Sequence, residues 1–217
     1  MYAEATVDQI IFSQEKEVYA AQNSWYDERE RLFSWAALQA NRAVDVVFLG
    51  DSITQKIEWA DFFPGLTVAN RGIGSDTTSG VLARLDSVIA LKPSVVSCMI
   101  GINDIAQGYT TEEIVQSYQK IFTQLRKELP EVQIIVNSVL PVTKDHIIQN
   151  KSVVVLNQAL SSMCEEENVT YLDIYYGFID EEGDLRPEYA LDMVHLTARG
   201  YAKWFESLVP VIHDALL

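Results

Sequence analysis

Cysteine is scarce in this 217-residue chain, which contains only Cys98 and Cys164. Two cysteines this far apart predict neither a disulfide framework nor a cysteine-rich metal site. Cys98 lies in an apolar run typical of a strand, and Cys164 lies in a helical stretch. We therefore expect both thiols to be buried as small hydrophobic groups, with a catalytic cysteine as the alternative.

Basic residues are few as well, because 16 Lys and Arg stand against 31 Asp and Glu, for a formal charge of −15. A surface of this sign repels phosphate backbones and anionic lipid headgroups. A nucleic-acid partner is therefore disfavoured, whereas a neutral or zwitterionic small molecule is compatible.

Long hydrophobic runs are missing, and none approaches the roughly 20 residues that span a bilayer. Residues 1–9 carry acids and no basic segment followed by an apolar one, so no secretory signal is expected. These features predict a cytoplasmic protein without stable membrane insertion. The length predicts a single domain over 1–217, with 1–43 as an N-terminal helical extension.

From about Val46 onward, short apolar runs alternate with amphipathic stretches, which is typical of a parallel sheet covered by helices. Thr110 and Glu113 form a capping-box pattern, Thr197 is the expected cap of the last helix, and Pro210 is expected to kink it. The prediction is a three-layer α/β/α sandwich with strands at 46–49, 66–69, 95–100, 132–138 and 169–174, and helices at 77–90, 111–129, 151–167 and 197–217.

The N-terminal segment carries an apolar stripe with a period of seven residues, which predicts a long helix. Such a helix packs either on its own domain, which is the simpler interpretation, or against a second subunit as a homodimer. The stripe consists of Ile11/Phe12, Val18/Tyr19, Trp25/Tyr26 and Leu32/Phe33.

Ser52 follows directly on the apolar run 46–49, within the sequence Gly50-Asp51-Ser52. In open α/β sheets, ligands bind at the carboxyl ends of the strands, where this serine is expected. A serine hydroxyl becomes nucleophilic when a neighbouring base takes its proton. The alternative is that Ser52 only caps the following helix.

Two further segments follow predicted strands. The sequence from Asn70 to Asp76 contains Gly72 and Gly74, whose backbone N–H groups can approach a developing negative charge. A plain turn before a helix capped by Asp76 is the alternative. Asn103 follows the run that ends at Ile100 and offers an amide donor at the same sheet edge, although an isolated asparagine there is often a turn residue.

His195 lies just before the last predicted helix, three residues after Asp192. An aspartate at this spacing can orient the imidazole through its Nδ1–H. The two side chains could instead be metal ligands, but no further His or Cys cluster completes a zinc site. The other histidines are His146 in a loop and His213 in the terminal helix, and both are expected at the surface.

These four segments, in this order, resemble the conserved blocks of the GDSL/SGNH hydrolase family, matching as Ser52, Gly72, Asn103 and His195, with Asp192 in the place of the family's acid. The longer stretches 72–85 and 192–203 are similar to the catalytic subunits of intracellular platelet-activating factor acetylhydrolase. Ile53 stands where the family often has leucine.

The resemblance implies a flavodoxin-like five-stranded parallel sheet of order 2-1-3-4-5 and a serine esterase without cofactor or metal. It implies Ser52, His195 and Asp192 as the triad, and Ser52, Gly72 and Asn103 as the oxyanion hole. Short connections after the second and third strands favour a small acyl group such as acetyl, with Asp51, Tyr175 and Phe178 as candidate substrate contacts. For the two aromatic residues, packing in the core is the alternative. The alternatives are a lysophospholipase or thioesterase of the same family, a phosphate- or flavin-binding module, and a non-enzymatic scaffold.

Overall fold

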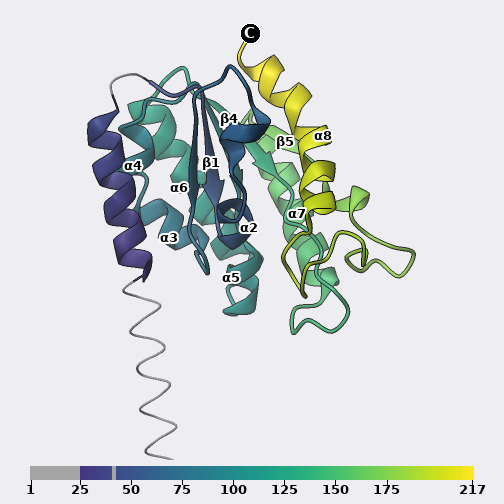
Figure 1. Cartoon of the computed structure of the whole chain (residues 1–217). Coiled ribbons are helices and arrows are strands. Elements are labelled where there is room, and N and C mark those ends of the chain that lie inside the picture. The colour runs from purple at the N-terminus through teal and green to yellow at the C-terminus, as the bar shows by residue number, and fades with distance from the viewer. Residues whose placement is uncertain (1–24, 41–42) are drawn as a thin grey trace, which may run out of the picture.

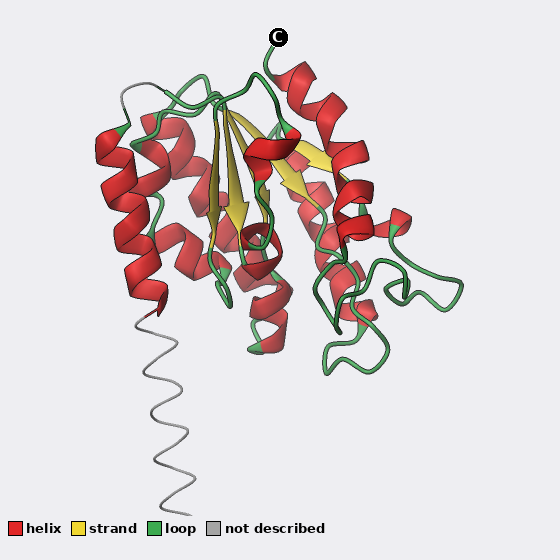
Figure 2. Cartoon of the chain, in the orientation of Figure 1, coloured by secondary structure: helices red, strands yellow, loops and turns green. Residues whose placement is uncertain are grey.

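The computed structural model describes residues 25–40 and 43–217, and a parallel sheet runs through its centre (Figures 1 and 2). The strand order is β2-β1-β3-β4-β5, and every neighbouring pair is parallel. The predicted fold class and strand order are therefore confirmed. The strands are β1 (Val46–Gly50), β2 (Val68–Gly72), β3 (Val95–Met99), β4 (Gln133–Asn137) and β5 (Thr170–Leu172).

The two faces of the sheet are covered by different helices because both faces of its central strands are apolar. In β1, Val47 and Leu49 face one hydrophobic core, whereas Val46 and Phe48 face the other. Alternation of side chains along a strand produces this division. The first core is covered by α3 (Thr78–Ala83), α4 (Asp86–Ile89), α6 (Thr111–Glu128) and α7 (Asn150–Glu166), and the second by α2 (Ser52–Gln55), the 3₁₀ turn η1 (Trp59–Phe62) and α8 (Ala198–Ala215).

Helix caps lie where the sequence predicts them. The Thr110 hydroxyl accepts the N–H of Glu113, and the Glu113 carboxylate accepts the N–H of Thr110, so the capping box of α6 is complete. Thr197 caps α8 through the N–H of Gly200. Helix α8 continues through Pro210 to Ala215.

The structure differs from the predicted elements in two places. The single helix expected at 77–90 is divided into α3 and α4 at Arg84, where the Ser87 hydroxyl donates to the Arg84 carbonyl and competes with the helical pattern. Strand β2 begins and ends later than predicted, because Asn70 and Arg71 belong to it. As an edge strand paired only with β1, β2 tolerates such polar residues. The sequence pattern also missed the short helices α2 and α5 (Ile102–Ala106) and the 3₁₀ turns η1 and η2 (Tyr175–Gly177).

A helix at 25–39 lies beside the layer formed by α3, α4 and α6 (Figure 1). Its buried side includes Phe33, whose ring lies under the guanidinium groups of Arg29 and Arg71, at 5.0 and 4.5 Å from the ring centroid. Within the described part of the predicted stripe, Tyr26 and Phe33 pack on their own chain, whereas Trp25 and Leu32 do not. Ile11, Phe12, Val18 and Tyr19 lie outside the described residues. The opposite side of the helix exposes Trp25, Leu32, Trp35 and Leu38.

Within residues 25–40 and 43–217, no helix combines the length and apolar character that crossing a membrane requires.

Candidate active site

Ser52 is the first residue of α2, at the carboxyl end of β1. The cap of this helix is Asp51, whose carboxylate accepts the N–H of Ile53 at 2.9 Å, so Ser52 does not serve as the cap. Gly50 makes the tight turn possible, because a Cβ there would overlap the Met99 carbonyl oxygen and the Thr54 hydroxyl. The hydroxyl of Ser52 is therefore left for an interaction outside its own helix.

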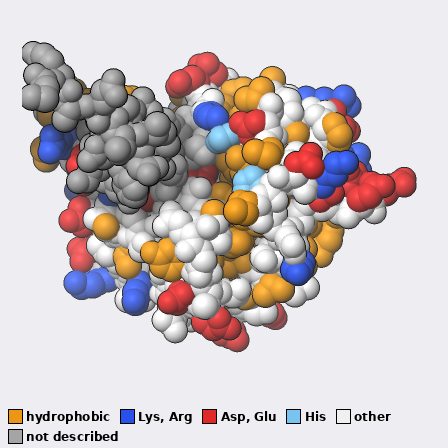
Figure 3. Space-filling model, turned by 90° about the horizontal axis from the view of Figure 1, so that it is seen from below, with side chains coloured by type: hydrophobic (Ala, Val, Ile, Leu, Met, Phe, Trp, Pro, Cys, Tyr) orange, Lys and Arg blue, Asp and Glu red, His pale blue; other side chains and the backbone are white. Residues whose placement is uncertain are grey.

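That interaction is with His195, which is 143 residues away in the sequence. The Ser52 Oγ lies 2.8 Å from His195 Nε2, and His195 Nδ1 lies 2.7 Å from Asp192 Oδ2. Because a carboxylate can only accept, Nδ1 carries the hydrogen and Nε2 is left to accept from the serine hydroxyl. Figure 3 looks from below Figure 1, toward the carboxyl ends of the strands, and histidine side chains are exposed on this face among hydrophobic groups.

Asp192 is held in place by the loop that it shares with His195. Its Oδ1 accepts the backbone N–H groups of Val194 and His195, at 2.9 and 2.8 Å. Burial raises the pKa of this carboxyl, but these two hydrogen bonds and the imidazole outweigh burial and hold the pKa well below its ordinary value. Asp192 therefore stays ionised throughout the range in which histidine titrates, and it can stabilise an imidazolium.

Asn103 lies in α5, directly after β3, and its side chain reaches the turn before α3. Its Nδ2 donates one hydrogen to the carbonyl oxygen of Asp76 at 2.8 Å. This bond fixes the orientation of the amide, while the second Nδ2 hydrogen has no protein partner among the described residues. The predicted convergence of Ser52, Asn103 and His195 on one edge of the sheet is thus observed.

Gly72 does not have the role that the sequence predicted. Its N–H donates to the side chain of Asn70 at 2.8 Å, so it is not free to bind an oxyanion. A Cβ at Gly72 would overlap the backbone of Gln55 and crowd the Asp51 carbonyl, and glycine is therefore needed for α2 to lie against β2. The oxyanion assignment of Gly72 is wrong, and the residue serves close packing instead.

Elsewhere in this turn, one backbone N–H group remains available to bind an oxyanion. The N–H groups of Ile73, Gly74, Asp76, Thr77 and Thr78 all donate to protein oxygens. Within the described part of the chain, the N–H of Ser75 has no such partner, and Ser75 has a positive φ of 62°. The neighbouring Gly74 lies against Ser52, since a Cβ on Gly74 would be 3.9 Å from that of Ser52.

A buried ion pair that the sequence reasoning missed joins these segments. Arg84 Nε lies 2.7 Å from Asp76 Oδ2, with both side chains at most 2% exposed, and Arg84 Nη2 donates to the Gly50 carbonyl at 3.1 Å. The alternative interpretation of this segment, a helix capped by Asp76, is also not observed, because Thr77 caps α3 and Asp76 Oδ1 accepts a hydrogen bond from the Tyr26 hydroxyl of the N-terminal helix. The pair therefore connects the end of β1 with the turn that holds Asn103.

Asp51 is buried and does not face a substrate, contrary to its prediction as a substrate contact. Burial raises its pKa from 3.8 to about 7, with further contributions from the carboxylates of Asp76 and Asp104, against the lowering effect of the Ile53 N–H. The folded chain consequently holds this proton at pH values where the unfolded chain has released it.

This pKa predicts a pH-dependent effect of Asp51→Asn, a change that keeps the helix cap and removes the charge. The contribution of Asp51 to the free energy of unfolding is largest below about pH 4 and falls as the pH rises to about 7. In this range the unfolded chain releases the proton, whereas the folded chain keeps it. The variant should match the original chain near pH 4 and exceed its unfolding free energy by up to about 4 kcal/mol at pH 8. Urea unfolding at both pH values measures the difference, and a difference that does not change with pH would contradict the prediction.

The two aromatic residues predicted as substrate contacts are also buried. Phe178 is 1% exposed and packs against Tyr189 in the core beneath α8. Tyr175 is 3% exposed and belongs to the core on the other face of the sheet. Neither side chain is therefore a substrate contact, and the alternative of core packing holds for both, on opposite faces of the sheet.

None of the remaining titratable candidates is hydrogen-bonded to Ser52 within the described residues. His146 Nδ1 accepts the N–H of Ile148, burial lowers the pKa of this histidine, and His213 is exposed on α8. Both cysteines are buried, as expected, and burial raises the pKa of each thiol to about 12, which keeps it protonated. Among the described residues, no group of three or more His, Cys, Asp or Glu could hold a metal ion.

Comparison with known proteins identifies the family of the chain. Residues 48–203 match the model of the GDSL-like lipase/acylhydrolase family. The platelet-activating factor acetylhydrolase IB subunit alpha2 of Rattus norvegicus is 34% identical over 180 residues, which cover 79% of this chain and 77% of that protein. The Gallus gallus subunit of the same name is 30% identical over 199 residues, covering 88% and 85%.

Solved structures show the same fold at lower identity. A protein from Streptococcus pneumonia, described in terms of platelet activating factor, has a TM-score of 0.87 at 22% identity, covering 92% of this chain and 98% of its own. The acetyl xylan esterase AlAXEase has a TM-score of 0.66 at 19% identity, covering 77% and 99%. From the family match and the curated relatives together, the chain belongs to the GDSL-like lipase/acylhydrolase family and is an ester hydrolase.

Proposed function

We propose that this hydrolase is a serine esterase in which Ser52 is the nucleophile, His195 the general base and Asp192 the residue that orients the base. The observation that carries the proposal is the continuous series of hydrogen bonds from Ser52 Oγ through both imidazole nitrogens to Asp192. A hydroxyl, an imidazole and a carboxylate in this order are the arrangement that activates serine for acyl transfer.

The proposed reaction has two halves. His195 Nε2 takes the proton of Ser52 as the oxygen attacks the ester carbonyl, and the imidazolium then gives this proton to the leaving alcohol. A water molecule, deprotonated by the same nitrogen, attacks the acyl-serine and releases the acid and the free serine. Asp192 remains ionised throughout and stabilises the imidazolium formed in each half.

The negative charge that develops on the carbonyl oxygen needs donors that are already in place. We assign this role to the N–H of Ser52 at the start of α2 and to the second hydrogen of Asn103 Nδ2. The N–H of Ser75 replaces that of Gly72 as the third donor, because it is the amide of its turn without a protein partner among the described residues and adjoins Gly74, which lies against Ser52.

Replacing Asn103 by alanine should lower kcat about 100-fold or more, with a smaller change in KM, because its donor acts mainly in the transition state. Steady-state hydrolysis of p-nitrophenyl acetate measures both constants. Gln107→Ala, an exposed change at the end of the same short helix, is the control and should leave kcat unaltered. An Asn103→Ala variant with full kcat would remove Asn103 from the mechanism.

For the substrate we propose an ester of a small acyl group, acetyl in the first place. The names of the relatives support this, since they refer to platelet-activating factor acetylhydrolase and acetyl xylan esterase. The short turn from Gly72 to Thr77 also leaves little wall for a long acyl chain, while Leu191 and Met193 give the loop beside His195 an exposed apolar rim. A phosphate-binding turn is not favoured, because nearly all amides of that turn already donate to protein oxygens.

A panel of p-nitrophenyl esters of rising chain length tests the acyl preference, with acetylated sugars beside them. We expect kcat/KM to fall sharply beyond acetyl. Even rates through long chains would instead indicate a lysophospholipase or thioesterase. Labelling with a serine-directed organophosphate tests the nucleophile independently, and it should give one adduct, on Ser52, with loss of all esterase activity.

A further inference from the structure

A second pocket lies at the edge of the sheet beyond β5, between α7 and the segment 171–176. Its volume is about 130 Å³, and it shares no lining residue with the group formed by Ser52, Asn103, Asp192 and His195. Its principal lining side chains are Gln158, Ser161, Tyr171, Asp173, Tyr175 and Tyr176.

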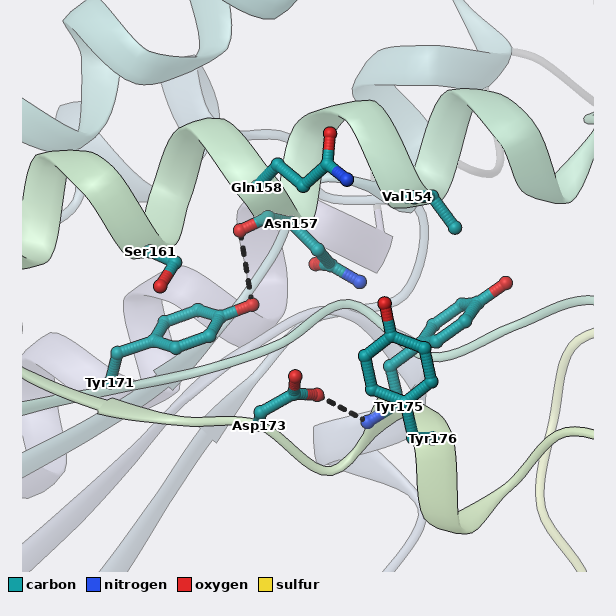
Figure 4. Close-up of a pocket in the computed structure, with 8 residues that line it drawn as sticks. All are labelled: Val154, Asn157, Gln158, Ser161, Tyr171, Asp173, Tyr175 and Tyr176. Atoms are coloured by element: carbon teal, nitrogen blue, oxygen red, sulfur yellow. Dashed lines mark hydrogen bonds between the residues drawn. The ribbon is translucent and has the colours of Figure 1, made fainter.

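Aromatic rings and an acid surround this pocket (Figure 4). The carboxylate of Asp173 lies between the ring of Tyr171 on one side and the rings of Tyr175 and Tyr176 on the other, with α7 above them. Tyr175 and Tyr176 pack edge to face at 5.5 Å, and Tyr176 is 64% exposed. An exposed ring held against a neighbouring ring provides a flat apolar surface on which a ligand can stack.

The polar groups of the pocket are mostly free. The Tyr171 hydroxyl donates to the Asn157 carbonyl, and Asp173 Oδ1 accepts the N–H of Tyr175. Burial raises the pKa of Tyr175 to about 12, so its hydroxyl keeps its proton and can donate. Among the described residues, no protein partner is found for the second Asp173 oxygen or for the side chains of Gln158, Ser161, Tyr175 and Tyr176.

Two kinds of ligand suit tyrosines beside a carboxylate, namely an organic cation and a polyhydroxylated ring. A quaternary ammonium would interact with the rings and with Asp173, but it has no hydrogen bonds to offer the amide and the three free hydroxyls. Polar groups that lose water without a replacement partner cost free energy. A sugar presents hydroxyls as donors and acceptors around its rim and C–H groups on its face, which match both features of the pocket.

We infer that this pocket binds one ring of a neutral carbohydrate, separately from the site of ester hydrolysis. The pocket's volume of about 130 Å³ is close to the roughly 150 Å³ of a cavity that holds benzene, so it has room for part of one six-membered ring. The pocket lies beside β5, three strands away from β1 in the sheet, which corresponds to about 14 Å at the usual strand spacing. It is therefore an additional attachment point and not part of the acyl site.

Titration with methyl β-D-xylopyranoside, followed by amide chemical shifts in NMR spectra, tests this inference. Saturable shifts are expected at residues 157–161 and 171–176. Tyr176→Ala should weaken binding about tenfold, which corresponds to about 1.4 kcal/mol. Ser161→Trp, an exposed change on α7 that fills the pocket, should abolish the shifts and leave p-nitrophenyl acetate hydrolysis intact, whereas Ser162→Ala is the matched control and should bind normally.

The same titration of Ser52→Ala separates this inference from the proposed mechanism, because sugar binding should persist in a chain without esterase activity. Shifts that centre on Ser52 and His195, or that survive in Ser161→Trp, would overturn the inference. Saturable shifts in this pocket with tetramethylammonium but not with the glycoside would assign the pocket to a cation instead. Absence of saturation with both probes would also overturn the inference.

Discussion

Replacing Ser52 by alanine is expected to lower kcat for p-nitrophenyl acetate by roughly 10⁴-fold or more, and His195→Ala should lower it by nearly as much. The two residues transfer one proton between them, and neither is useful without the other. The double variant should therefore be no slower than the slower single variant. Residual activity should come from the oxyanion donors and from substrate binding.

Single-turnover and steady-state rates of the three variants provide the measurement. Ser162→Ala, an exposed serine on α7, is the control for a generic loss of a hydroxyl and should retain full activity. If the losses of the two single variants multiply in the double variant, Ser52 and His195 act independently, and the proposed proton transfer between them is wrong.

The largest effect on stability is expected from Arg84→Met, which leaves the charge of Asp76 buried without its partner. Loss of one member of a buried ion pair costs about 3–5 kcal/mol. Here the pair is at most 2% exposed, and Arg84 also donates to the carbonyl of Gly50, so the full loss is expected. Urea unfolding followed by circular dichroism measures it. Because the pair anchors the turn that holds Asn103, kcat should fall too.

Two further variants give this prediction its controls. Lys203→Met removes an exposed pair with Glu206 and should change the unfolding free energy by less than about 1 kcal/mol. Adding Asp76→Asn to Arg84→Met should recover part of the lost stability, since the uncompensated charge disappears. If Arg84→Met unfolds at the same urea concentration as the original chain, the ion pair has no structural importance.

The sequence was sufficient for the architecture because hydrophobic patterning determines it. The runs at 46–49 and 95–100 are apolar on both faces, which requires a covered parallel sheet. Helix ends with an explicit cap, such as Thr110 with Glu113, were also placed correctly. The ends of β2 were not placed correctly. Pairing with β1 decides whether polar Asn70 and Arg71 belong to this edge strand, and the local sequence does not show the pairing partner.

The site residues likewise include some that the sequence predicted and some that it did not. The approach of Ser52, Asn103 and His195 could be predicted from their places at strand ends and before the last helix. The role of Gly72 could not, because the use of its N–H depends on the rotamer of Asn70. The Asp76–Arg84 pair was missed because burial of an arginine is a tertiary property. The only available signal was that an acid and a base lie eight residues apart on one short segment.

The short loop that carries both Asp192 and His195 makes the general base a local unit. Asp192 is fixed by amides of its own loop, which is closed by an antiparallel bridge between Ala190 and Leu196, whereas the nucleophile belongs to β1 far upstream. A chain cut at the exposed Glu182 would therefore yield two inert pieces, of which the smaller carries both the acid and the imidazole. Since helix α8 of this piece buries Trp204, Leu208 and Ile212 against the sheet, fragment complementation should restore turnover, and the colour of a released nitrophenolate would report reassembly.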